Sequence, residues 1–305
     1  MESNSQKKYL ITVIGPTAIG KTAMAIELAK HFNCEILSAD SRQFFKEMNI
    51  GTAVPSEEEL AAAPHHFIQN ISVFEDYTVG DFERDAIEKL DELYKTNDFA
   101  VLVGGSGLYI DAVLKGFDDF PDIDPAIRQE IIDNYEKNGI TWLQQELEKR
   151  DPIHYANVAK ENPQRMMRAL EVCIASGKPY SSFLNVKKNS RRFTPIIIGL
   201  DAERELMYNR INMRVDIMVN NGLLEEAKVL YPHKKLNALQ TVGYRELFSY
   251  FDGEFTKDFA IEEIKKNTRR FAKRQMTWFK RTEGTKWFDF KTPPQEIINY
   301  IENTL

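Results

Sequence analysis

The sequence predicts an α/β fold in which a parallel sheet is flanked by helices and an all-helical insertion interrupts the alternation. Buried strands are expected where apolar and β-branched residues run together, at 10–14, 99–103 and 193–200. Glycine follows each of the first two runs and a helical pattern comes next, which is typical of strand-turn-helix units. From Pro125 to about Leu184 only helical spacing is found. The chain therefore divides into a sheet-bearing core and one helical insertion.

The first strand leads into a phosphate-binding pattern. Residues 15–22 read GPTAIGKT and fit the P-loop pattern G-x-x-x-x-G-K-[ST] at every constrained position. Its glycines let successive N–H groups point inward, Lys21 adds a compact positive charge, and the Thr22 hydroxyl can hold Mg²⁺. Good helix formers at 23–30 place a helix N-terminus against the anion. The sequence thus predicts a P-loop NTPase-like sheet whose phosphate site is formed by Gly15, Pro16, Thr17, Ala18, Ile19, Gly20, Lys21 and Thr22.

A second short strand is expected at 34–40, and it ends in Asp40. Since ligands of an open parallel sheet bind beyond the carboxyl ends of its strands, Asp40 would lie beside the P-loop. Its carboxylate has three interpretations: a magnesium ligand, a general base acting on an acceptor substrate, or a helix N-cap. The strand before Gly104 ends in glycines, where many nucleotide hydrolases place a magnesium-binding aspartate.

Between the second and third strands, the pattern predicts a short helix at 57–63 and a longer amphipathic helix at 79–95. His65 and His66 lack the spaced carboxylate or cysteine partners of a metal site. We therefore expect both histidines to be structural.

The chain changes character near 116–121, where the alternation of strands and helices stops. The helices that follow are expected to break at glycines and prolines, namely Gly139, Pro152, Pro163 and Gly177. We predict a core formed by residues 1–118 and 191–305, and an insertion domain formed by residues 119–190.

Two pairs of arginines lie at helical spacing. Arg165 and Arg168 share one face of a helix in the insertion, where surface salt bridges and ligand binding are both open. Arg210 and Arg214 follow the return to the sheet, and their spacing of four residues forms a basic stripe suited to phosphate oxygens.

The most charged stretch runs from Lys265 to Arg281, where eight of seventeen residues are basic and none is acidic. On a helix, one face would carry Lys266, Arg270, Arg274 and Arg281. Phe271 and Trp278 lie on another face, which we expect to pack against the body of the protein. Nucleic acid phosphates are the partner that such a one-signed stripe favours, and too few large apolar residues oppose it for a membrane surface.

The composition is that of a globular protein outside the membrane. The 305 residues carry a formal net charge of −6, and no apolar run approaches the ~20 residues that span a bilayer. Residues 1–8 contain no apolar core of a signal peptide. Cys34 and Cys173 lack a C-x-x-C partner, which argues against a disulfide framework and a zinc module. We expect a cytoplasmic protein with no membrane partner.

Taken together, these stretches resemble one family, the tRNA dimethylallyltransferases, also called tRNA isopentenyltransferases. The matching motifs run in order across nearly the whole chain: GPTAIGKT at 15–22, ADSRQ at 39–43, MNIGTA at 48–53, LVGGSGLY at 102–109, NPQRMMRALEV at 162–172, RINMRVDIM at 210–218, TVGYRE at 241–246 and AKRQMTWFK at 272–280. The chain departs from the family at Phe45, Val54 and Ile19, where tyrosine, lysine and serine are often found. The length resembles that of the bacterial form, without the zinc finger of eukaryotic relatives.

The resemblance implies transfer of a dimethylallyl group from dimethylallyl diphosphate to the exocyclic N6 of adenosine 37 in tRNA. The P-loop would hold the diphosphate of the donor, with Mg²⁺ on Thr22 as the implied metal ligand. Lys21 and Arg210 or Arg214 would stabilise the charge on the leaving pyrophosphate. Asp40 would act as general base on the acceptor amine. The implied catalytic residues are thus Asp40, Thr22, Lys21, Arg210 and Arg214.

The resemblance also implies contacts with the tRNA anticodon stem-loop from both the core and the insertion. The residues concerned are Asp40, Ser41, Arg42, Gln43, Ser106, Arg128, Gln164, Arg165, Met166, Met167, Arg168, Gln240, Thr241, Val242, Gly243, Tyr244 and Arg245. The target adenine must leave its stack to reach a buried site, and the basic helix would bind backbone phosphates. Because tRNA supplies a large partner surface, we expect a monomer whose insertion closes over the anticodon loop.

Two rival functions use the same features. A small-molecule or nucleotide kinase would bind ATP at the P-loop and use Asp40 to accept a hydroxyl proton. An RNA-binding NTPase switch would hydrolyse ATP or GTP without group transfer. The basic helix and the arginine-bearing insertion favour the transferase, because a kinase with a small acceptor has little use for them.

Overall fold

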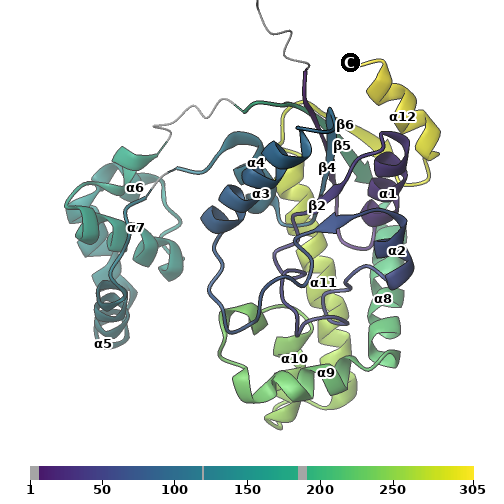
Figure 1. Cartoon of the computed structure of the whole chain (residues 1–305). Helices are drawn as coiled ribbons and strands as arrows, with labels where there is room; N and C mark the ends of the chain where they lie inside the picture. Colours follow the sequence, from purple (N-terminus) through teal and green to yellow (C-terminus); the bar gives the residue numbers. More distant parts are fainter. Residues whose placement is uncertain (1–6, 119, 185–190) are drawn as a thin grey trace, which may run out of the picture. The chain divides into compact units, whose positions relative to one another are not determined.

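The computed structural model describes residues 7–118, 120–184 and 191–305 (Figure 1). It separates into two compact units, residues 1–114 with 191–305 and residues 115–190. Residues 1–6, which belong to the segment without a signal-peptide pattern, lie outside the described residues. The same holds for residues 119 and 185–190 at the two ends of the predicted insertion.

The first unit is built on a six-stranded sheet in which every pairing is parallel, with strand order β3-β2-β4-β1-β5-β6. Its strands are β1 (Tyr9–Ile14), β2 (Ile36–Ser38), β3 (His65–His66), β4 (Phe99–Val103), β5 (Thr194–Asp201) and β6 (Thr285–Asp289). The predicted parallel sheet with flanking helices is confirmed. The edge strands β3 and β6 are additions to the sequence prediction.

Helices cover both faces of the sheet (Figure 1). Ile11 and Val13 of β1 pack in a cluster with α1 (Lys21–His31) and α12 (Pro294–Glu302). Leu10 and Ile14 point the other way, into a cluster with α3 (Val79–Leu93) and α4 (Gly107–Lys115). This alternation with a period of two places both faces of the central strand in the core.

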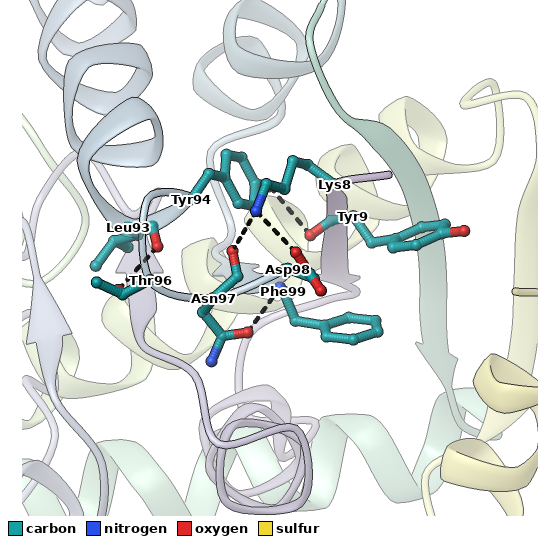
Figure 2. A network of polar contacts seen from close by, with 8 residues as sticks. All are labelled: Lys8, Tyr9, Leu93, Tyr94, Thr96, Asn97, Asp98 and Phe99. Carbon is teal, nitrogen blue, oxygen red and sulfur yellow. Dashed lines mark hydrogen bonds and ion pairs between the residues drawn. The ribbon is translucent and has the colours of Figure 1, made fainter. Parts of the chain in front are cut away.

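The two central strands are tied together at their N-terminal ends, as Figure 2 shows. Lys8 Nζ donates to the carbonyl oxygen of Asn97 (3.1 Å) and to Asp98 Oδ1 (2.7 Å). The Tyr94 hydroxyl donates to the carbonyl oxygen of Tyr9 at 3.0 Å. These bonds fasten β1 to the segment that enters β4, so the opposite, carboxyl ends of the two strands come level with each other.

Beyond those carboxyl ends, a third apolar cluster is formed by α8 (Arg204–Asn220), α9 (Leu223–Leu230), α10 (Tyr244–Phe251) and α11 (Lys257–Phe279). The short helices α2 (Glu57–Ala62), η2 (Tyr231–His233) and η3 (Asn237–Leu239) complete this unit. Ile264 of α11 packs in the third cluster and Phe279 packs on the sheet. The long helix α11 therefore connects the sheet to the helices beyond its carboxyl edge (Figure 1).

The two histidines of β3 make structural contacts. His66 Nε2 lies 2.6 Å from Glu35 Oε2, and His65 Nδ1 lies 2.7 Å from the carbonyl oxygen of Ala63. Within the described ranges, no group of three or more His, Cys, Asp or Glu side chains is placed to hold a metal ion.

The second unit is helical, with α5 (Pro125–Arg150), α6 (Pro152–Asn157), α7 (Pro163–Ser176) and η1 (Tyr180–Phe183). The predicted breaks are confirmed, because α5 is kinked at Gly139, α6 and α7 begin at prolines, and Gly177 ends α7. Its own core includes Ile131, Leu143, Leu147 and Leu170.

Candidate active site

The loop after β1 is shaped to bind an anion. Gly20 adopts φ 107°, a left-handed conformation that favours glycine, and α1 begins at the next residue. No side chain among the described residues caps this helix, so its first N–H groups are left for a ligand. The arrangement joins an inward-facing loop to the positive end of a helix dipole.

Lys21 lies inside this loop, where its Nζ donates to the carbonyl oxygen of Pro16 at 2.8 Å. Burial lowers the pKa of Lys21 to about 8, with the Arg214 charge adding to this effect and the Asp40 charge opposing it. A lysine held in this way loses its charge readily unless an anion is bound beside it.

Two arginines of α8 reach the same loop. Arg210 Nε donates to the carbonyl oxygen of Ala18 at 2.8 Å, and an Arg214 guanidinium nitrogen lies 3.4 Å from Thr17 Oγ1. Burial lowers the pKa of Arg214, while the charge of Asp40 raises it. Both guanidinium groups line a cavity of about 570 Å³ with Lys21, which we call the phosphate-loop cavity.

Asp40 comes two residues after the end of β2 and starts a turn. Its Oδ1 accepts a hydrogen bond from the Arg42 N–H at 3.1 Å, so the carboxylate caps a turn and not an α-helix. The Ser106 hydroxyl oxygen accepts from the Ser41 N–H at 3.0 Å. Ser106 thereby joins this turn to the glycine-rich turn after β4.

A second cavity of about 470 Å³ adjoins the first, and we call it the apolar cavity. Its apolar lining is formed by Leu108, Ile211, Val215, Met218, Phe271 and Trp278. Four residues line both cavities, namely Thr17, Asp40, Arg214 and Gln275. Asp40 is therefore a carboxylate placed between a cavity lined by cationic side chains and one lined by apolar and aromatic side chains.

The face of α11 that carries Phe271 and Trp278 is only partly covered by the body of the protein: the Trp278 ring lies against Gly107 of α4, but neither side chain is buried. Their side chains are 38% and 40% exposed, and both line the apolar cavity. Trp278 Nε1 donates to Asp111 Oδ2 at 2.8 Å. The face of α11 that is covered carries Ala272, Gln275 and Phe279 instead. Helical spacing shows which residues share a face, but not what that face meets.

Gln275 is a site residue that the sequence analysis missed. Gln275 lies within the basic stretch at 265–281, whose charged residues indicated phosphate binding, and a single glutamine does not by itself indicate a site. The signal was present in the matching motif at 272–280, which contains this residue.

Several residues expected at the tRNA interface hold the turn itself in place. The Arg42 guanidinium donates to the carbonyl oxygens of Asn237 (3.1 Å) and Ala238 (2.9 Å). Gln43 Nε2 donates to the carbonyl oxygens of Thr52 (3.2 Å) and Ala53 (2.9 Å). These two side chains connect the Asp40 turn with neighbouring loops.

The loop before α10 lines the apolar cavity through Gln240, Thr241, Val242 and Gly243, and α10 itself adds Arg245. Tyr244, expected among the tRNA contacts, is fully buried, and its hydroxyl donates to Glu226 Oε1 at 2.6 Å. Its side chain is therefore part of the third apolar cluster and has no surface for RNA.

The remaining residues of the expected tRNA interface belong to the second unit. Gln164, Arg165 and Arg168 are exposed on α7, and the Arg168 guanidinium lies over the Phe120 ring at 5.5 Å. Arg128 and Arg168 both pair with Glu171, whose side chain is buried. Met166 and Met167 are 0% and 3% exposed in the core of this unit, so their side chains serve packing and not RNA contact.

Several cations in and beside the basic stripe of α11 are paired with acidic side chains, so fewer are available to bind phosphates than the sequence predicted. Of the predicted stripe, Lys266 pairs with Glu263, whereas Arg270, Arg274 and Arg281 are exposed. Two neighbouring lysines outside the stripe are also paired: Lys265 with Asp216 (2.8 Å) and Glu262 (3.0 Å), and Lys280, just after α11, with Asp201 (2.9 Å). The acids of the preceding turn, Glu262 and Glu263, are visible in the local sequence, whereas Asp216 and Asp201 come from other elements and could not be found from it. The exposed cations of this helix include Arg270, Lys273 and Arg274.

We expect the affinity for inorganic pyrophosphate to fall as the pH rises through about 8, where Lys21 changes from the charged to the neutral form. Below that pH the ammonium form predominates and favours the anion. Calorimetric titration would measure this. Because pyrophosphate itself titrates, the quantity to compare is the ratio of dissociation constants of the wild type and Lys21→Arg, whose side chain stays charged. A ratio that does not change with pH would contradict the prediction.

None of the helices in the described part of the chain is long and apolar enough to cross a bilayer.

Comparison with known proteins shows which family the chain resembles over its whole length. A family model described as IPP transferase matches residues 43–282. The tRNA dimethylallyltransferase of Flavobacterium johnsoniae is 68% identical over 98% of this chain and 98% of its own length. The enzyme of the same name from Christiangramia forsetii is 60% identical over 97% of this chain and 98% of its own length.

Solved structures share the fold. The crystal structure of the full-length tRNA isopentenylpyrophosphate transferase of Bacillus halodurans superposes with a TM-score of 0.72 at 37% identity, covering 97% of this chain and 96% of that one. A eukaryotic dimethylallyltransferase described as acting on tRNA gives a TM-score of 0.82 at 25% identity, covering 97% of this chain and 80% of that one. The predicted P-loop NTPase-like fold is thereby confirmed. Given this identity over nearly the full length, the chain belongs to the tRNA dimethylallyltransferase family and is a prenyltransferase acting on tRNA.

Proposed function

We propose that this enzyme transfers the dimethylallyl group of dimethylallyl diphosphate to N6 of adenosine 37 in the tRNA anticodon stem-loop and releases pyrophosphate. The observation that carries the proposal is the position of Asp40 at the junction of the phosphate-loop cavity and the apolar cavity. A donor with its diphosphate in the first cavity and an adenine inserted into the second would bring their reacting atoms beside this carboxylate.

On the donor side, the residues supply positive charge where negative charge develops. As the bond between C1 of the donor and the diphosphate oxygen breaks, its electron pair leaves on the pyrophosphate. Lys21, Arg210 and Arg214 line the cavity that would hold this group, together with the N–H groups at the start of α1. Preorganised donors in a buried site are an effective way to stabilise such a leaving group.

On the acceptor side, the reaction needs a base. The N6 lone pair is delocalised into the purine ring, so N6 is a weak nucleophile, and its proton becomes acidic only as the N6–C1 bond forms. Asp40 would accept that proton. The exposed aromatic side chains of Phe271 and Trp278 in the apolar cavity suit an adenine taken out of its stack, since bases stack well on aromatic rings.

The site also suits Mg²⁺. The Thr22 hydroxyl and the Asp40 carboxylate line the phosphate-loop cavity, and Mg²⁺ prefers oxygen ligands, keeps several waters and is often held by substrate phosphates with one or two protein groups. When bound with the donor, the ion would add positive charge at the leaving pyrophosphate.

For the tRNA, the proposal keeps the exposed members of the expected interface. Arg245 and the loop at 240–243 border the apolar cavity, and the second unit would contribute Arg128, Gln164, Arg165 and Arg168. These groups would read or hold the anticodon arm, while exposed cations of α11 would contact phosphates. We also propose that the enzyme acts as a cytoplasmic monomer.

The test is to incubate the protein with Mg²⁺, radiolabelled dimethylallyl diphosphate and an anticodon stem-loop carrying A36 and A37, with no ATP, and to count the label in the RNA. We expect incorporation that is lost when A37 is replaced by G, and that falls when Mg²⁺ is chelated. No incorporation, together with phosphate release or phosphoryl transfer on adding ATP, would overturn the proposal in favour of a kinase or an NTPase switch.

A further inference from the structure

Gln275 of α11 lies between the two cavities and lines both of them. Its side chain is only 5% exposed, yet both of its polar ends are satisfied. Oε1 accepts a hydrogen bond from the Thr17 N–H at 2.8 Å, and Nε2 donates to the carbonyl oxygen of Gly105 at 2.8 Å. One amide therefore connects the loop after β1 to the turn after β4.

The turn after β4 is shaped around this amide. A Cβ atom at Gly105 would lie 2.5 Å from Gln275 Nε2 and 3.6 Å from Asp40 Oδ2. Only glycine permits this close approach without displacing the glutamine, and the same approach brings the turn next to the Asp40 carboxylate. Gln275 thus sets the separation between the phosphate loop and the turn that adjoins Asp40.

The helix that carries Gln275 also forms a wall of the apolar cavity. Phe271, Arg274 and Trp278 stand four residues before, one before and three after Gln275, and all three line that cavity. A group that binds against these side chains therefore contacts the same part of α11 that carries Gln275, whose side chain accepts the hydrogen bond from the Thr17 N–H. Thr17 is in turn within 3.4 Å of the Arg214 guanidinium in the phosphate-loop cavity.

We propose that Gln275 is a positioning residue that couples the two substrate cavities, so that an RNA base in the apolar cavity and a diphosphate in the phosphate loop each bind more tightly when the other is present. This inference rests on the function proposed above for the two cavities. The coupling passes through a single side chain held at both ends, and by linkage it is the same in both directions.

The measurement is the dissociation constant of inorganic pyrophosphate, with Mg²⁺ present, in the absence and presence of saturating anticodon stem-loop. In the wild type we expect the RNA to tighten pyrophosphate binding about fivefold or more, the usual lower range for coupled sites. Gln275→Met fills a similar volume but makes neither hydrogen bond. It should bring this ratio close to one, and by the same linkage pyrophosphate should no longer tighten the binding of the stem-loop.

Thr277→Val is the matched control, since it removes a hydrogen bond on an exposed position of the same helix and should keep the wild-type ratio. Gln275→Glu is the second variant: it retains an oxygen for the Thr17 N–H but loses the donor to Gly105, and we expect it to lose the coupling as well. Thermal unfolding checks that each variant is folded.

The inference is refuted if Gln275→Met keeps the wild-type ratio, or if the wild type shows no coupling. It also fails if pyrophosphate binding weakens equally with and without RNA, because that would indicate simple damage to the loop. A wild type that shows coupling but transfers no dimethylallyl group to the stem-loop would instead count against the proposed function alone.

Discussion

Asp40→Asn is expected to slow dimethylallyl transfer by about 10²- to 10⁴-fold, the usual contribution of a general base, while the affinity for tRNA stays within about tenfold. Asparagine retains an oxygen that can accept from the Arg42 N–H, so the turn should survive and only the proton acceptor is lost. Single-turnover transfer to the stem-loop measures the chemical step, and a filter-binding titration measures the RNA affinity.

The control is Asp76→Asn, which makes the same change of charge on an exposed loop and should leave the rate unchanged. A collapse of tRNA binding in Asp40→Asn, with the single-turnover rate preserved at saturating RNA, would show that Asp40 binds RNA and is not the base.

Lys21→Met should lower kcat/KM for dimethylallyl diphosphate by about 10²- to 10³-fold, as expected when one charge-stabilising donor is removed from a transition state. The ammonium group lies at 2.8 Å from the Pro16 carbonyl oxygen inside the loop, and the loop N–H groups and both arginines of α8 remain in the variant. Because the buried charge costs desolvation, we expect no loss of thermal stability.

Lys30→Met on the same helix provides the comparison, because its side chain is half exposed and pairs only weakly with Glu27 at 3.6 Å. It should keep the wild-type kcat/KM. If Lys21→Met lowered the affinity for tRNA and not that for the donor, the assignment of the diphosphate to this loop would be wrong.

The parts of the fold that the sequence predicted are those with strong local signals. The strands β1, β4 and β5 are covered by helices on both faces, so they read as continuous apolar runs. The edge strand β6 has no fully buried residue, and β3 is two residues long. Neither carries a local pattern, because both exist only through pairing with a strand already in the sheet.

In the candidate site too, some residues could be predicted from local sequence and others could not. The phosphate loop and the Asp40 turn are each a contiguous segment, and their residue types are enough to predict phosphate binding and proton transfer. Gln275, Phe271 and Trp278 gain their places from how α11 crosses the carboxyl edge of the sheet, which is a long-range packing result. The burial of Tyr244 and Met167 could not be told from motifs that place them beside exposed arginines, whereas Met166 is spaced four residues from Leu170 on the apolar face of its helix.

The position of the helical unit in the chain has a consequence for how the protein is made. In the finished sheet β1 lies between β4 and β5, with Tyr9 opposite both Phe99 and Thr194. A ribosome must therefore synthesise all of residues 115–190 before the strand that closes the second edge of β1 exists. The helical unit is held by contacts close in sequence, which favours early folding, whereas β1 has no partner along its second edge until β5 is synthesised. We expect nascent chains that end before β5 to expose that edge and to recruit chaperones, and completion of β5 to release them.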